Sequence, residues 1–101
     1  MEETADVLLG KRTLLVDGQE EIEIRIFVPV CEEDGNYRCC FSREGLIWDG
    51  RLRKAYGVDA IQALYGALQS VGSDLHEVKA TMGRRVEWLG SEDLGLPKLD
   101  V

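Results

Sequence analysis

The chain has 101 residues, of which 45% are hydrophobic and 31% are charged, and its formal net charge is −7 at pH 7. This length and composition are typical of one soluble globular domain. An acidic surface repels phosphate backbones, so no nucleic-acid partner is expected. No stretch approaches the roughly 20 apolar residues that a membrane helix needs, and the acidic start lacks the apolar core of a secretory signal.

The three cysteines, Cys31, Cys39 and Cys40, are odd in number and include no CxxC pair. This count argues against a disulfide framework or a zinc site. We therefore predict no cofactor. We also predict a cytoplasmic protein, because free thiols persist in a reducing compartment.

A flexible tail is predicted over residues 1–10, followed by a single domain. The first strand is expected at 11–16 and the second at 21–28, where apolar and mostly charged residues alternate. Such alternation is typical of a strand with one buried face and one solvated face. Asp17-Gly18 between the two strands is a tight-turn signal, so the two strands form a hairpin.

Alternation also predicts a third strand at 37–42, in which Cys39 is the core residue of the vicinal pair. Two turn signals follow, Glu44-Gly45 and Asp49-Gly50, and a fourth strand is expected at 51–56. Trp48 lies between these turn signals, which favours partial exposure.

A long amphipathic helix is predicted from Asp59 to Met82. Asp59 is a good N-cap with Gln62 in the capping-box position, and Gly83 ends the helix. The expected buried stripe consists of residues at three- and four-residue steps: Ile61, Leu64, Tyr65, Leu68, Val71, Leu75, Val78 and Met82.

A short last strand is expected at 86–89, and the domain is predicted to span residues 11–90. The C-terminal tail, residues 91–101, carries Leu94, Leu96 and Leu99. The order of elements is ββββαβ, which predicts an α+β fold in which an antiparallel β-meander of four to five strands packs on one long α-helix in two layers. The sheet position of the last strand stays open.

The stretch from Ala60 to Ser73 contains no charged residue. A solvated helix normally carries charge on its outer side, so we expect this helix to be covered on more than one side. The side opposite the apolar stripe is the predicted interaction surface, and its residues are Gln62, Gly66, Gln69, Ser70 and Ser73. Three explanations stay open: the C-terminal tail packs on this side, a second copy packs on it in a homodimer, or it faces water.

Residues that could carry catalysis are scarce. His76 is the only histidine and is expected at the surface, and Cys40 would need a lowered pKa to act as a nucleophile. No phosphate-binding glycine loop or nucleophile-elbow motif is present. We therefore predict no catalytic, cofactor-binding or metal site.

Several short motifs are familiar. The segments Gly57–Leu64 (GVDAIQAL), Trp88–Gly90 (WLG) and Asp93–Pro97 (DLGLP), together with Tyr37 and Cys39, resemble a family of small bacterial proteins described as a domain of unknown function. The resemblance covers roughly residues 11–97. It implies a cytoplasmic stand-alone domain, and it implies no activity and no functional residues.

The leading hypothesis is a small non-enzymatic interaction protein that acts through a protein partner or as a homodimer. A second hypothesis is a small-molecule-binding domain with a pocket near Tyr37, Trp48 and Tyr65. A third is a toxin-neutralising or regulatory partner, because residues 1–34 contain ten acidic and three basic residues that could cover a basic site.

Overall fold

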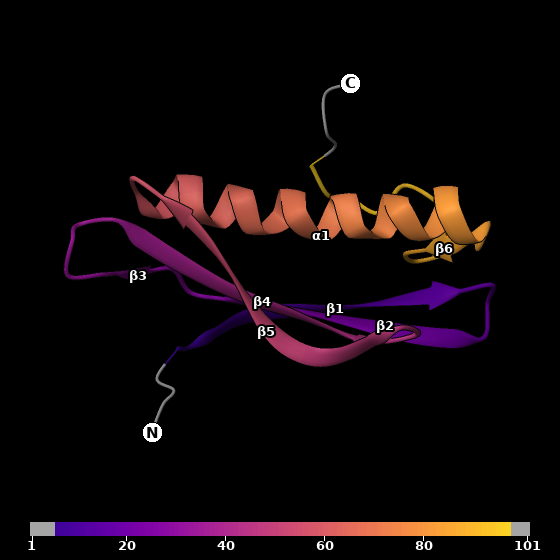
Figure 1. The fold of residues 1–101 in the computed structure, drawn as a ribbon. Coiled ribbons are helices and arrows are strands. Elements are labelled where there is room, and N and C mark those ends of the chain that lie inside the picture. Colours follow the sequence, from indigo (N-terminus) through magenta and orange to yellow (C-terminus); the bar gives the residue numbers. More distant parts are fainter. Residues whose placement is uncertain (1–5, 98–101) are drawn as a thin grey trace.

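The computed structural model of the chain describes residues 6–97. Figure 1 shows one long helix lying along one face of an antiparallel sheet, which confirms the predicted α+β fold. The elements in chain order are β1 Leu8–Val16, β2 Glu20–Phe27, β3 Val30–Cys31, β4 Tyr37–Gly45, β5 Trp48–Gly57, α1 Ala60–Met82 and β6 Val86–Glu87. Among the described residues, no helix is long and apolar enough to cross a membrane.

The sheet is built from four long strands with two short additions. β1 and β2 form the predicted hairpin, and β4 and β5 form a second one. β2 and the two-residue β3 pair with successive parts of the same edge of β4, while β5 lines its other edge. β6 pairs with the end of β1 at Leu15 and Val16, which fixes the strand that the sequence left unplaced.

Several boundaries differ from the prediction. β1 begins at Leu8, so residues 8–10 belong to the strand and not to a tail, while residues 1–5 lie outside the described part. Asp49-Gly50 is not a turn: it lies within β5, where a register shift against β4 marks a bulge. The hairpin turn consists of Leu46 and Ile47, and Gly45 precedes it as the last residue of β4. The φ of 114° at Gly45 and its close approach to the Glu21 carbonyl are tolerated only by glycine.

The ends of α1 follow the predicted signals. The Asp59 carboxylate accepts a hydrogen bond from the Gln62 backbone N–H at 2.8 Å. The Gln62 side-chain oxygen accepts in turn from the Val58 N–H at 2.7 Å, so two free donors at the start of the helix are satisfied. Gly83 ends the helix in the left-handed conformation.

The buried stripe of α1 is rotated from the predicted one. Its residues are Ala63, Ala67, Val71, Leu75 and Val78. Ile61 is 79% exposed and Tyr65 50% exposed, so placing them in the core was wrong. The small alanines allow the first half of the helix to lie close to the sheet, and Figure 1 shows β5 curving up to meet this end of α1.

The core lies between α1 and the facing side of the sheet. It contains the alternating residues of the first hairpin, the inward residues of β4, the buried stripe of α1 and one residue of β6. These residues are Leu14, Val16, Ile22, Ile24, Ile26, Cys39, Phe41, Ala63, Ala67, Val71, Leu75, Val78 and Val86. The assignment of Cys39 to the core is confirmed, but Cys40 is also buried, on the other face of the sheet. Burial of this apolar surface is the main force that holds the two layers together.

Candidate functional site

The predicted interaction surface on α1 is partly used inside the molecule. The side chain of Gln62 takes part in the helix cap, although the residue is exposed. Gly66 lies over β5, where a Cβ on it would sit 3.6 Å from the Cβ of Ala55. Gln69, Ser70 and Ser73 are half-buried. The side of α1 that carries Gly66 therefore faces β5.

The C-terminal segment covers another side of α1. Leu94 and Leu96 pack against the core, and the backbone oxygen of Pro97 comes so close to Gly72 that a Cβ there would lie only 2.7 Å from it. Leu99, the third leucine that was predicted to fold over the helix, lies outside the described residues. The helix therefore has the C-terminal segment as a neighbour besides the sheet, which accounts for part of its missing charge.

A cation–π contact anchors this segment. The guanidinium of Arg12, on β1, lies 3.7 Å from the centre of the Trp88 ring and donates a hydrogen bond to the Leu94 carbonyl at 2.8 Å. Gly95, with a φ of 67°, passes so close to the same ring that a side chain would not fit. Trp88 is thus half-buried beside the tail and lies at the margin of the core.

An apolar groove lies between β1, β2, α1 and the C-terminal segment. Its volume is about 280 Å³, and it is lined by Leu9, Gly10, Lys11, Arg12, Ile24, Ile26, Leu64, Leu68, Gly95 and Leu96. Leu9 is 55% exposed at its rim. Ile61 and Tyr65 precede Leu64 and Leu68 by three positions each, so they extend the apolar surface outward along the helix. We call this cavity and its rim the β1–α1 groove.

The groove differs from the pocket that the sequence suggested, since its lining does not include Tyr37, Trp48 or Tyr65. Sequence reasoning placed Leu64 and Leu68 in the core stripe and treated Leu9 as part of a tail. The run of apolar residues at 7–9 was the available signal, because such residues at an exposed strand start mark a surface that another group can cover.

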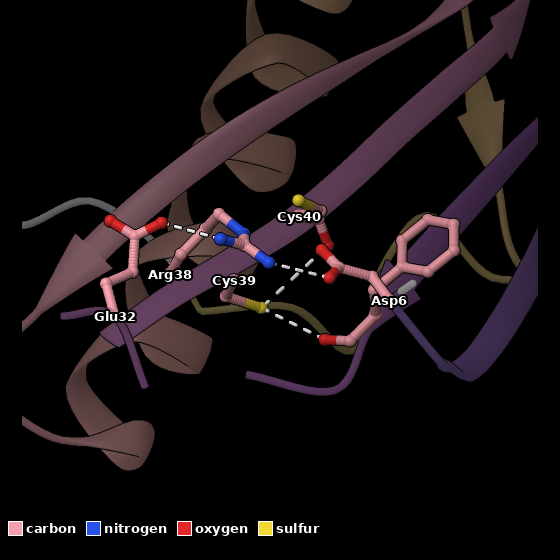
Figure 2. A network of polar contacts seen from close by, with 6 residues as sticks. Asp6, Glu32, Arg38, Cys39 and Cys40 are labelled. Carbon is pink, nitrogen blue, oxygen red and sulfur yellow. Dashed lines mark hydrogen bonds and ion pairs between the residues drawn. The ribbon is translucent and has the colours of Figure 1, made fainter. Parts of the chain in front are cut away.

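Figure 2 shows a cluster of polar and thiol groups near the start of β4. Arg38 donates to Asp6 at 2.7 Å and to Glu32 at 2.5 Å. The hydrogen bond from Arg38 holds the pKa of the Asp6 carboxyl below its usual range. The Cys39 thiol donates to the Phe27 carbonyl at 3.2 Å. These contacts join β4 to Asp6, which lies just before β1, to the end of β2 and to the loop after β3.

Both thiols of this cluster are less acidic than usual. Burial raises the pKa of Cys39 from 9.0 to about 11. Burial and the neighbouring Asp6 carboxylate also raise the pKa of Cys40. Because the thiolate is the nucleophile, these raised pKa values disfavour nucleophilic attack by either thiol at neutral pH. His76 is exposed on α1, and the described residues contain no group of three or more metal-ligating side chains.

Comparison with known proteins gives one match. The family model of a domain of unknown function, DUF6968, matches residues 10–98. No curated protein and no solved structure matches the chain. The matched range includes all of α1 and the lining of the β1–α1 groove except Leu9. Since the match covers most of the sequence, the chain belongs to the DUF6968 family, a domain of unknown function.

Proposed function

We propose that this protein is a small non-enzymatic interaction protein that binds an extended apolar segment of a protein partner in the β1–α1 groove. The uncharged stretch Ala60–Ser73 carries the proposal. It has exposed Ile61 and Tyr65 directly beside the apolar lining of the groove. Apolar residues that line an open groove and continue onto an uncharged surface are typical of a docking site.

The backbone beside the groove favours an extended ligand. Within residues 6–97, β1 pairs with β6 only at Leu15 and Val16, so its stretch 8–13 has strand pairing on the β2 side alone. An incoming strand can hydrogen-bond to such an edge, and its alternate side chains then point to one face. On this sheet edge, one of those two faces is the apolar groove. Main-chain pairing would supply affinity, and the groove would select apolar side chains.

The raised thiol pKa values and the exposed position of His76 support a binding role over an enzymatic one. The three free cysteines support a cytoplasmic location, because such thiols stay reduced there. A second copy of the chain is the alternative occupant, since two β1 edges can pair about a two-fold axis.

Light scattering coupled to size exclusion separates the two occupants. A dimer at micromolar concentration would make the second copy the partner, and a monomer would leave the groove to a different protein. To compare the two cases, the same measurement is made on Leu9→Arg and on Leu52→Arg. Leu9 is 55% exposed at the groove, and Leu52 is 53% exposed on β5, so the pair is matched in exposure.

For a different partner, we expect a random peptide library to yield peptides with alternating apolar residues. Their affinity, measured by fluorescence polarisation, should fall at least about tenfold in Leu9→Arg, because the new charge would lose water on binding. The Leu52→Arg variant should bind like the original protein. Peptides that bind both variants equally well, in a protein that is monomeric, would remove the groove as the docking site.

A further inference from the structure

A second cavity lies on the helix side of the β4–β5 hairpin. Its volume is about 290 Å³, and it is lined by Arg43, Trp48, Asp49, Arg51 and Arg53. Arg53 lies opposite Phe41 in the β4–β5 register, and Arg43 follows Phe41 by two positions. Because strand residues alternate between faces, both arginines lie on the same face of the sheet as the core residue Phe41.

Arg43 is the buried member of this group. It is 8% exposed, and its Nη1 donates to the Asp74 carboxylate at 2.6 Å. Its Nε is buried and has no hydrogen-bond partner. The guanidinium carbon lies 4.9 Å from the centre of the Trp48 ring. A buried donor of a charged group without a partner is costly, so an acceptor that reached it would stabilise the site.

The cavity also holds more positive than negative charge. Three guanidinium groups surround it, against the carboxylates of Asp49 and Asp74. Arg51 is 3.8 Å from Asp49, and no carboxylate within residues 6–97 forms an ion pair with Arg53. Burial lowers the pKa of Arg43, although the neighbouring Asp74 carboxylate raises it. Bound negative charge would offset the cost of burying this cation.

We propose that the cavity formed by Arg43, Arg51, Arg53 and Trp48 is a binding site for a phosphate group. Guanidinium groups donate paired hydrogen bonds to oxyanions. Three of them from two strands match a tetrahedral anion with several acceptor oxygens better than a planar carboxylate with two. The inference is independent of the β1–α1 groove. The phosphate can be free or attached to a peptide, because the arginines would bind the same phosphate oxygens in both cases.

The test is calorimetric titration of the whole chain with inorganic phosphate and with a phosphoserine peptide, at constant ionic strength. Arg53→Gln removes an exposed charge, so this variant should fold normally. We expect it to weaken binding about tenfold, as for the loss of one charge-assisted hydrogen bond. Arg25→Gln is the control: it removes the same charge from a half-buried residue that forms an ion pair with Glu23 and lies opposite Ser42, on the other face of the sheet. Its affinity should change less than about twofold.

Trp48 provides an independent readout. Its ring lies against Arg43 in the cavity, so its fluorescence should change on phosphate binding. Trp48→Phe should lose that change. The other tryptophan, Trp88, lies against Arg12 of β1, far from β5 across the sheet, so its fluorescence should not report on the cavity. Tighter binding of inorganic phosphate identifies a free anion as the ligand, and tighter binding of the phosphopeptide identifies a modified protein. Equal weakening in Arg53→Gln and Arg25→Gln, or binding of neither phosphate source, would overturn the proposal.

Discussion

Cys39 and Arg43 show how single inward positions on β4 acquire different chemistry. The inward residues of this strand are Tyr37, Cys39, Phe41 and Arg43, three apolar or weakly polar groups followed by a cation. Cys39 behaves as a small hydrophobe whose thiol reaches a backbone carbonyl. Arg43 needs an ion pair from α1 to lie in the same layer. Both residues are buried, and their nearest partners differ: a backbone carbonyl for Cys39 and a carboxylate for Arg43.

The raised pKa of Cys39 predicts a loss of stability in alkali. Its pKa is about 11 in the folded chain and near 9.0 when exposed, so between these pH values only the unfolded state releases the proton. The stabilisation is complete below pH 9 and is lost as the pH rises, by about 2 to 3 kcal/mol at pH 11. Urea unfolding at several pH values measures this slope.

Two cysteine variants test this assignment. Cys39→Ala should lower stability at neutral pH, because it leaves a small cavity, but should flatten the alkaline decline. Cys31→Ala removes an exposed thiol and should leave the decline unchanged. An equal decline in all three proteins would assign the effect to other groups, such as Cys40, whose pKa is also raised by burial.

At the scale of the element, α1 shows that sequence periodicity predicts where a helix forms but only roughly which of its sides faces the sheet. The sequence offered two adjacent stripes, one with large residues such as Ile61 and Tyr65 and one with Ala63 and Ala67. The second stripe is the buried one. A helix that crosses close to a curved strand needs small residues at the contact, because interiors are tightly packed.

Overpacking tests which stripe is buried. Ala67→Leu should lower the free energy of unfolding by about 1 to 3 kcal/mol, since the added side chain has no space against the sheet. Ala80→Leu changes an exposed position of the same helix and should stay within about 0.5 kcal/mol of the original. Denaturant titration measures both, and equal effects would contradict the observed rotation.

At the scale of the whole molecule, segments that are far apart in the chain meet around α1. β5 lies beside Gly66, and the backbone of Pro97 lies beside Gly72. The C-terminal segment also contacts β1, through the hydrogen bond from Arg12 to Leu94. These contacts close one side of the β1–α1 groove, so the shape of the proposed docking site depends on the chain's last described residues.

The two helix glycines predict opposite outcomes for the same substitution. Gly66→Ala should stabilise the protein by about 0.5 to 1 kcal/mol, because its Cβ makes an ordinary contact with Ala55 and alanine favours helix. Gly72→Ala should lose this gain, because its Cβ would displace Pro97. Faster proteolysis at residues 94–97 in Gly72→Ala than in Gly66→Ala would report the displaced segment. The same gain and the same cleavage rate in both variants would show that the segment does not pack on Gly72.

Several features of the fold followed from the sequence because their causes are local. Asp17-Gly18, Asp59 with Gln62, and Gly83 each satisfy or redirect the backbone within a few residues of themselves. Alternation along β2 reports directly on its two faces. Gly50 was misread as a turn because a glycine with positive φ suits a bulge as well as a turn, and only pairing with β4 distinguishes them.

The candidate sites were not predictable in this way. The uncharged stretch of α1 marked a side that needed explanation, but the neighbours it meets within the molecule, Ala55 and Pro97, lie at unrelated places in the sequence. The basic residues Arg51 and Arg53 were one local signal for the proposed phosphate cavity, and Arg43, which continues an otherwise apolar alternation, was the other. Its meaning depended on Asp74 and Arg53, which only the fold brings near it.

The sequence by itself determined the fold class, the ends of the helix and the inward faces of β2 and β4, because hydrogen bonds and periodicity act over short stretches of chain. The tertiary structure decided the rotation of α1, the pairing of β6 with β1 and the shapes of the two cavities. These depend on which side chains fill the space between distant segments, and close packing selects one arrangement among several that the pattern allows.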